Sequence, residues 1–146
     1  MFKKILVALS EHELDSFVNT PVFETLDGFL LEQDTTVILS HVVPVTASEL
    51  DRGMDQHHES ESLLQEKIQQ VQSKLQNLLM AALDFEVVSG EPGEEIVRLA
   101  NIHQTELIIL GSRDLRGVSR VLNQSVSSQV CEEAPCSVLV VKSGQR

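Results

Sequence analysis

The feature that most constrains the fold of this chain is a set of five short apolar runs rich in β-branched residues. They lie at residues 4–9, 36–43, 84–88, 106–110 and 137–141. Runs that are apolar at every position are typical of strands covered on both faces, as in a parallel sheet. The run at 84–88 alternates between apolar and polar residues, which indicates a more exposed edge strand. These runs predict a parallel sheet between two layers of helices.

Helical patterns separate the apolar runs. Thr20-Pro21 combines a capping residue with proline at the first helical position, which predicts a helix from residue 20 to about residue 33. The next helix is indicated by apolar residues spaced alternately four and three apart, at Leu64, Ile68, Val71, Leu75, Leu78 and Ala82.

Two more helices complete the alternation. One follows Gly90-Glu91-Pro92, with acidic residues in its first turn, and another spans about 119–133. Because strand and helix alternate along the chain, we expect an α/β fold with an open, doubly wound, Rossmann-like sheet and right-handed crossovers.

Length and composition favour one domain over residues 1–146, since 42% hydrophobic residues are enough for a single core. No apolar run reaches the roughly 20 residues that span a bilayer, and the first residues lack the cleavage site of a signal peptide. We therefore expect a cytoplasmic protein without a membrane partner. Cys131 and Cys136 are expected to be reduced, packed thiols.

The net charge of −11 argues against a nucleic-acid partner, because binding phosphate backbones requires a basic surface. Three arginines nevertheless lie close together at Arg113, Arg116 and Arg120. Ligands of open parallel sheets bind beyond the carboxyl ends of the strands. The glycine-flanked segment 111–117 and the serines after it predict an anion site there. A surface loop whose arginines pair with acidic residues is an equal alternative.

Classical motifs of other sites are missing from the sequence. It contains neither a Walker loop nor the pattern Gly-x-Gly-x-x-Gly. His57 and His58 lack the spacing of a helical zinc pair, and we expect residues 51–61 to form a solvated polar loop. We predict no metal site and no catalytic residue.

Several segments, in the same order along the chain, resemble the universal stress protein family. Its carboxyl-terminal signature is similar to residues 111–122, 125–130 and 134–142 of this chain, and further matches lie at 4–8, 39–43 and 90–96. The resemblance implies a five-stranded sheet in the order 3-2-1-4-5, of the adenine nucleotide alpha hydrolase-like type.

The resemblance also implies where an adenine nucleotide would bind. Members that bind ATP carry an aspartate after the first strand and the pattern Gly-x2-Gly-x9-Gly-Ser/Thr. In this chain Ser10 stands in place of the aspartate, Asp114 in place of the second glycine and Gln124 in place of the third. The candidate nucleotide or anion site therefore consists of matched and neighbouring positions: Ala8, Ser10, Val42, Gly111, Arg113, Gly117, Arg120, Ser125, Val126 and Ser127.

The replaced glycines decide between two functions. A side chain at Asp114 or Gln124 blocks close approach of a phosphate to the backbone, and the Asp114 carboxylate repels it. We therefore predict a non-catalytic stress-response module that contacts unknown protein partners and holds no firm cofactor. The alternative is a sensor of adenine nucleotides, ATP or AMP, with a degenerate phosphate loop. A hydrolase is disfavoured because no Gly-x-Ser-x-Gly elbow is present, and His41 is expected to be packed or to face a dimer partner.

The last apolar run predicts self-association. In the implied strand order, residues 137–141 form an exposed apolar edge, which proteins usually cover or pair. The resemblance implies antiparallel pairing with the same strand of a second copy, giving a homodimer.

Overall fold

The computed structural model describes residues 2–29, 31–44, 54–112 and 118–142, with the backbone alone for residues 54–60 and 118–125. In this part of the chain, parallel strands form a sheet in the order β3-β2-β1-β4-β5, which confirms the predicted fold class and strand order. The strands are β1 Lys4–Ala8, β2 Thr36–Val43, β3 Ala82–Ser89, β4 Leu107–Ser112 and β5 Ser137–Lys142.

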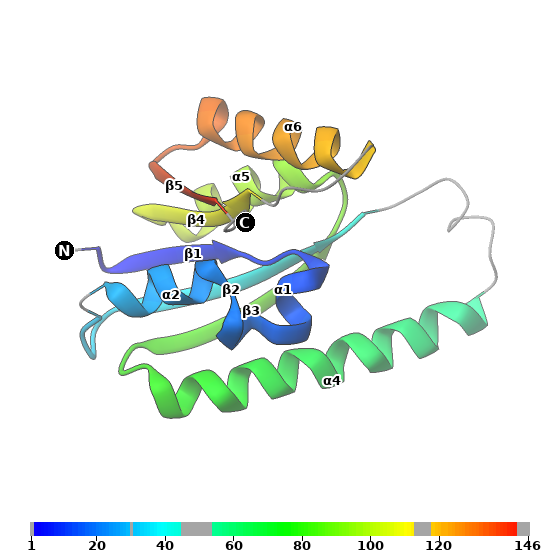
Figure 1. Ribbon diagram of the computed structural model, residues 1–146, viewed down its shortest axis with the longest axis horizontal. Coiled ribbons are helices and arrows are strands. Elements are labelled where there is room, and N and C mark those ends of the chain that lie inside the picture. The colour runs from blue at the N-terminus through cyan, green and yellow to red at the C-terminus, as the bar shows by residue number, and fades with distance from the viewer. Residues whose placement is uncertain (1, 30, 45–53, 113–117, 143–146) are drawn as a thin grey trace.

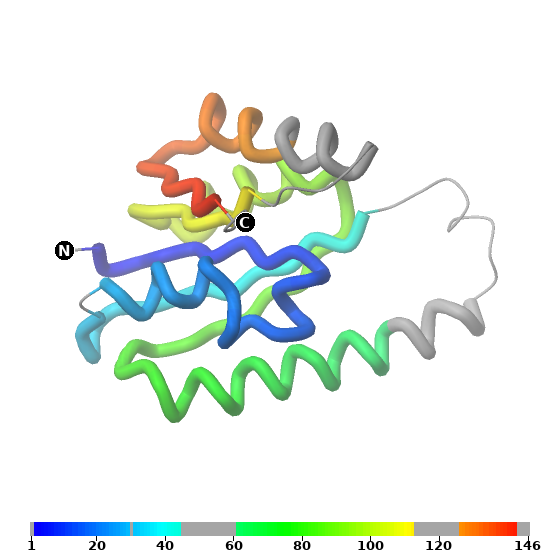
Figure 2. Tube along the Cα trace, in the orientation of Figure 1, coloured from blue at the N-terminus to red at the C-terminus, as the bar shows by residue number. Residues whose placement is uncertain are grey.

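Helices cover both faces of the sheet (Figure 1). One face carries α1 (Glu11–Ser16), the 3-10 turn η1 (Phe17–Asn19), α2 (Pro21–Gly28) and α4 (Met54–Leu78). The other carries α5 (Pro92–His103) and α6 (Val118–Glu133). Figure 2 shows the described part of α4, in green, running along the side of the sheet that α1 and α2 occupy.

Each face of the sheet has its own apolar cluster. The α1/α2/α4 cluster is formed by the strand residues that point to one face, such as Val7 and Ile109, and by Phe17, Leu26 and Leu75 from the helices. The α5/α6 cluster takes the alternate strand residues, among them Leu6, Ile38 and Ile108, together with Leu99 and Val130. The central strands are therefore apolar at every position because they are buried on both faces.

The sheet edges differ in composition. β3 is longer than the predicted run at 84–88, but it is an edge strand as expected, and Ala82, Asp84, Val87 and Ser89 are exposed on it. The central strand β1 pairs with β2 and β4 and buries Ile5, Leu6 and Val7. The alternating pattern of β3 thus reflects one strand neighbour and partial solvent contact.

The predicted helix at 20–33 is wrong at its end. Thr20 caps α2 as expected, with its Oγ1 accepting a hydrogen bond from the Phe23 N–H, but the helix ends at Gly28. Glycine has low helix propensity, and Phe29 beyond it packs against the α1/α2/α4 cluster. The short helix α1 that precedes Thr20 was not predicted.

The prediction of a polar loop at 51–61 is also wrong where the structure describes it, because α4 begins at Met54 and includes His57 and His58. Elongation of an existing helix adds one hydrogen bond per residue without a new nucleus, and glutamine, glutamate and methionine are good helix formers. Residues 51–53 lie outside the described residues. The apolar stripe holds for Ile68, Val71 and Leu75, whereas Leu78 is exposed and Ala82 belongs to β3.

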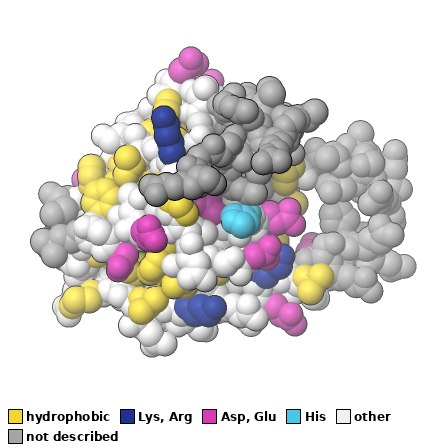
Figure 3. Space-filling model, viewed as in Figure 1, with side chains coloured by type: hydrophobic (Ala, Val, Ile, Leu, Met, Phe, Trp, Pro, Cys, Tyr) yellow, Lys and Arg dark blue, Asp and Glu magenta, His cyan; other side chains and the backbone are white. Residues whose placement is uncertain are grey.

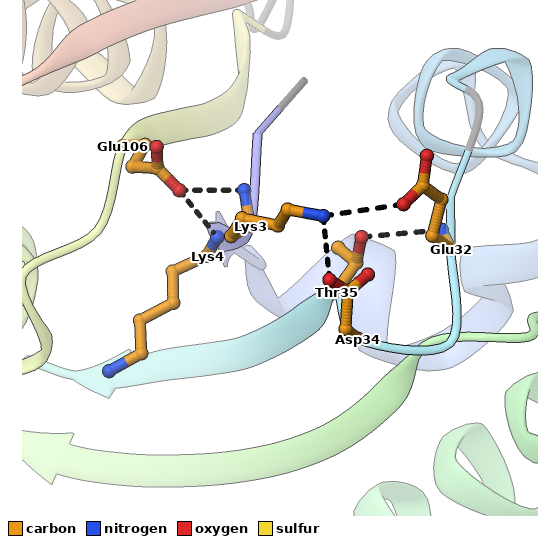
Figure 4. A network of polar contacts seen from close by, with 6 residues as sticks. All are labelled: Lys3, Lys4, Glu32, Asp34, Thr35 and Glu106. Atoms are coloured by element: carbon orange, nitrogen blue, oxygen red, sulfur yellow. Dashed lines mark hydrogen bonds and ion pairs between the residues drawn. The ribbon is translucent and has the colours of Figure 1, made fainter.

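Polar contacts tie the amino ends of three strands together (Figure 4). The backbone N–H groups of Lys3 and Lys4 donate to Oε1 of Glu106 at 2.6 and 3.1 Å. The Lys3 ammonium donates to Asp34 at 2.6 Å and to Glu32 at 3.3 Å. The hydrogen bonds to Asp34 and Glu32 raise the pKa of Lys3, and the one from Lys3 lowers the pKa of Asp34. These contacts lie at the amino ends of the strands. Ligands of open α/β sheets bind at the opposite end, beyond the carboxyl ends of the strands.

None of the helices described here has the length and apolar character needed to cross a membrane.

Candidate functional site

The strand order creates one position where a ligand site is expected. From β1 the chain continues to β2 on one side, whereas β4 lies on the other side and pairs with β1 from Ile5↔Leu107 to Ala8↔Leu110. Open α/β sheets bind ligands at such a switch point, beyond the carboxyl ends of the two diverging strands. The residues that stand there are Ser10 and Glu13 after β1, and Gly111 and Ser112 at the end of β4. We call these four residues the switch-point site.

Ser10 and Glu13 form a reciprocal cap at the start of α1. The Ser10 Oγ accepts a hydrogen bond from the Glu13 N–H at 3.4 Å, and both the Ser10 N–H and its hydroxyl donate to Oε1 of Glu13 at 2.9 Å. This arrangement is a capping box, which satisfies amide groups that the first turn of a helix leaves without partners. The cap holds the carboxyl group of Glu13 in one orientation.

Strand β2 supports the turn between β1 and α1. The Leu9 N–H donates to the Ser40 carbonyl at 2.8 Å, and Nδ1 of His41 lies 2.8 Å from the Leu9 carbonyl oxygen. His41 is 8% exposed and is therefore packed, as predicted. The turn that carries Ser10 is held by backbone and side-chain bonds from the neighbouring strand.

Glu13 reaches from α1 to the end of β4. Its side chain is buried, at 4% exposure. Its Oε2 lies 3.1 Å from the point where a Cβ atom of residue 111 would stand, and Cγ2 of Val22 is equally close to that point. A residue larger than glycine at position 111 would press against this carboxyl group and against Val22, so the close approach favours glycine there.

A hollow of about 100 Å³ lies beside these groups. Its walls come from α1, η1, α2 and the ends of β4 and β5: His12, Glu13, Asn19, Thr20, Pro21, Val22, Gly111, Ser112 and Val141. Figure 3 shows acidic and histidine side chains close together on this face, over α1. Side chains that accept hydrogen bonds are prominent in the wall, and the buried carboxyl group of Glu13 gives it an acidic component.

An ion pair fastens α1 to α4 near the hollow. The Lys67 ammonium lies 2.8 Å from Oδ1 of Asp15. The hydrogen bond from Lys67 lowers the pKa of Asp15, and the same bond raises the pKa of Lys67. Among the described residues, no group of three or more histidine, cysteine or acidic side chains is placed to hold a metal ion.

The structure separates the predicted site residues into two groups. Ser10 and Gly111 belong to the switch-point site, whereas Ala8, Val42 and Val126 pack against the α5/α6 cluster on the other face of the sheet. Ser127 is half-buried on α6.

The cationic part of the prediction is not described by the structure. Arg113, Asp114 and Gly117 lie outside the described residues. Arg120, Gln124 and Ser125 are on α6, but their side chains lie outside the described part.

Glu13 and its neighbours in the hollow were missed by sequence reasoning. A signal was present, because Ser10 followed by glutamate at the third helical position is the pattern of a capping box. It would have predicted α1 and the orientation of Glu13. The contact with Gly111 has no local signal, because it joins segments that are far apart in the sequence.

The comparisons with known proteins agree with this fold. The sequence model of the universal stress protein family matches residues 1–142. The universal stress protein Sll1388 of Synechocystis sp. is 28% identical, over 97% of this chain and 98% of its own length.

Solved structures share the architecture. The structure of the hypothetical protein MJ0577 has a TM-score of 0.77 at 24% identity and covers 100% of this chain and 99% of its own. A universal stress protein family protein from Arabidopsis thaliana with AMP bound has a TM-score of 0.57 at 15% identity, over 97% of this chain and 92% of its own. With the strand order, the family match and these shared folds in agreement, the chain belongs to the universal stress protein family.

Proposed function

We propose that this protein is a non-catalytic regulatory module of the stress response that acts as a homodimer and binds adenine nucleotides weakly or not at all. The observation that carries the proposal is the size of the hollow that the described residues form at the switch-point site, about 100 Å³. Pockets that hold small molecules of nucleotide size usually enclose about 300–1,000 Å³.

The packing of two candidate residues supports the same function. Val42 is 9% exposed and belongs to the α5/α6 cluster, and Ala8 packs against the same cluster. Apolar side chains that already pack in the core would have to give up part of that packing to contact the adenine base of a nucleotide, and this lowers the affinity. Asp114 and Gln124, which stand in place of two glycines of the phosphate pattern, also lower the affinity for a nucleotide.

The proposal of a non-catalytic role rests on how the polar groups near the site are used. The Ser10 hydroxyl donates to Glu13 within a helix cap, and the His41 ring contacts the Leu9 carbonyl oxygen in the interior. Nucleophilic catalysis requires a base within hydrogen-bond reach of the nucleophile and a path to substrate. Both groups have structural partners instead.

The proposed dimer forms through β5. Its central residues Val138 to Val141 are half-buried and apolar, and β4 pairs with it on one side. The other edge strand, β3, carries Asp84 and Glu86, and charged residues on an edge oppose pairing with another chain. The difference between the two edges favours β5 as the pairing strand.

The proposed place of action is the cytosol. Cys131 and Cys136 are both free thiols in the structure. Cys136 is half-buried, whereas Cys131 is exposed, so the expectation of a packed thiol is wrong for Cys131. Free thiols are usual in the reducing cytosol, whereas secreted proteins use cysteine mainly in disulfides.

The alternative function is an adenine-nucleotide sensor. It is favoured by one finding, the AMP bound to the Arabidopsis thaliana protein with the same fold. If this alternative holds, replacing Ser125 and Arg120 with alanine abolishes binding, because Ser125 keeps the hydroxyl of the phosphate pattern and Arg120 supplies a positive charge five residues before it in the sequence.

One experiment separates the two functions. Native mass spectrometry of freshly purified protein reports bound nucleotide and subunit number together, and isothermal titration with ATP and AMP then measures affinity. We expect dimers without nucleotide and dissociation constants near millimolar. Co-purified nucleotide or a micromolar dissociation constant would favour the sensor and contradict our proposal.

A matched pair of variants tests the dimer. Val140→Lys places a charge on β5, and Val87→Lys places the same charge on β3, where Val87 is 37% exposed. In size-exclusion chromatography with light scattering we expect Val140→Lys to be monomeric or insoluble and Val87→Lys to remain dimeric. An unchanged dimer in folded Val140→Lys would contradict pairing through β5.

A further inference from the structure

We propose that the open edge of β3 binds a basic, extended segment of a partner protein as an additional strand of the sheet. The inference rests on the proposed function, because it names the surface through which the module contacts a partner. Self-association through β5 does not use this surface, since β3 and β5 stand at opposite ends of the strand order (Figure 1).

Strand β3 presents a regular row of hydrogen-bonding groups. All of its residues, 82–89, pair in continuous register with β2. The N–H groups of Ala82 and of Gly90, just after β3, donate to the carbonyl groups of residues 35 and 43. In a strand the N–H and C=O groups of one residue point to the same side, and those of the next residue point to the opposite side. The even-numbered residues therefore bond to β2, and the groups that point to the open edge are those of Leu83, Phe85, Val87 and Ser89.

Two carboxyl groups stand on one face of this edge. Oε1 of Glu86 lies 2.8 Å from Nε2 of His103 at the end of α5, which places Glu86 on the α5 side of the sheet. Asp84 is on the same side, since alternate residues of a strand share a face. It is exposed, and its carboxyl group has no hydrogen-bond or ion-pair partner among the residues that the structure describes.

These carboxyl groups determine which chain can pair with β3. A second copy of this protein has a net charge of −11 and the same acidic edge, so pairing of β3 with β3 is opposed. Basic side chains opposite Asp84 and Glu86 form favourable cross-strand pairs instead. The other common obstacles at an edge, which are proline, a bulge or lysine, do not occur in β3. The edge therefore opposes acidic strands and accepts basic ones.

The opposite face of the same edge is apolar. Leu83 and Phe85 are half-buried against the α1/α2/α4 cluster, and Val87 is 37% exposed. Every second side chain of an added strand would lie on this face, while the others lie beside the two carboxyl groups. The segment that fits is therefore a strand of about six residues in which basic and apolar side chains alternate.

Synthetic peptides test the kind of segment that binds. Fluorescence anisotropy with the full chain compares the peptide Lys-Val-Lys-Val-Lys-Val-Lys with two controls. One has glutamate in place of each lysine, and the other has the same composition in the order Lys-Lys-Lys-Val-Val-Val-Lys. We expect both controls to bind at least about tenfold more weakly. No binding of the first peptide, or equal affinity for the two lysine peptides, would overturn the inference.

A matched pair of variants tests the backbone of the edge. Val87→Pro removes an N–H that points to the open edge and keeps the bonds to β2, whereas Val87→Ala shortens the side chain and keeps that N–H. We expect Val87→Pro to weaken binding at least about tenfold and Val87→Ala less than about threefold. Equal losses would contradict strand addition. If Val87→Pro does not fold, the same peptide with methylated alternate amides is titrated into the unaltered chain, and undiminished binding would contradict it.

The charge of the edge is tested separately. Asp84→Asn should weaken binding of the alternating lysine peptide about two- to fivefold, and Asp27→Asn, at an exposed position on α2, should leave it unchanged. An equal effect of both changes would mean that the overall charge, and not the edge, attracts the peptide.

Hydrogen exchange locates the bound peptide. We expect it to slow exchange of the Phe85 and Val87 amides, while those of Asp84 and Glu86 are already bonded to β2. Slowed exchange confined to β5 would overturn the inference. The folded Val140→Lys variant should bind the peptide as a monomer. An unaltered chain that is monomeric but binds the peptide would contradict only the proposed dimer, whereas a dimer that does not bind it would contradict only the role of β3.

Discussion

Glu13 lies close to Gly111 across the switch point, with Oε2 of the glutamate 3.1 Å from the point where a Cβ atom of residue 111 would stand. The contact joins the first helix to the end of β4 and places a carboxyl group beside the switch point. A side chain at this position would press on Glu13 and Val22, whether or not a ligand binds.

Gly111→Ala tests this packing. The added methyl group meets both the carboxylate of Glu13 and Cγ2 of Val22 at 3.1 Å, so we expect the free energy of unfolding to fall by about 1–3 kcal/mol. Gly28→Ala is the control, since a Cβ there meets nothing within 4 Å, and it should stabilise by about 0.4–1 kcal/mol. Urea unfolding of both variants measures the difference, and equal effects would contradict the contact.

Thr20→Ala tests the junction between η1 and α2. Thr20 is 4% exposed, donates to the Phe17 carbonyl at 2.6 Å and accepts from the Phe23 N–H at 3.3 Å. Losing this cap should cost about 1–2 kcal/mol in urea unfolding. Thr25→Ala on the same helix removes only a bond to a carbonyl one turn earlier and should change stability little. A cost in Thr25→Ala as large as in Thr20→Ala would show that capping is not the cause.

Leu75→Ala and Leu78→Ala compare the two sides of α4. Leu75 is fully buried in the α1/α2/α4 cluster, and Leu78 is 54% exposed. We expect a loss of about 2–5 kcal/mol for Leu75→Ala and a change within about 0.5 kcal/mol for Leu78→Ala. A large loss at Leu78 would place a further contact, such as a second copy of the chain, on that side of the helix.

Two surface carboxylates should titrate below the ordinary aspartate value of 3.8, because Lys3 donates to Asp34 and Lys67 donates to Asp15. A pKa lowered by folding contributes stability above the unfolded value, and that stability is lost as pH falls through the folded value. Carboxyl NMR titration should therefore show each pKa below 3.8 in the unaltered chain.

The two lysine variants serve as controls for each other. Lys3→Gln should return only the pKa of Asp34 toward 3.8, and Lys67→Gln only that of Asp15. Movement of both values in either variant would indicate a general charge effect instead of two separate ion pairs.

Strand positions and the parallel sheet could be predicted from the sequence because burial on both faces demands continuous apolar residues, as in Ile5 to Val7. The helix cap at Thr20 could also be predicted from the sequence, because it depends on residues within one turn. The end of that helix was not, because propensity alone did not show that Phe29 would leave the helix to join the apolar cluster.

Local chemistry therefore determined the layered fold, the edge strand β3 and the starts of α2, α5 and α6, since each depends on periodicity or on groups a few residues apart. The complete strand order, with β5 at the other edge, followed only from the resemblance to the family. Tertiary structure alone decided the character of the site. A carboxylate is buried against a glycine only when the folded chain brings α1 to the end of β4, and the residues on either side carry no local record of that contact.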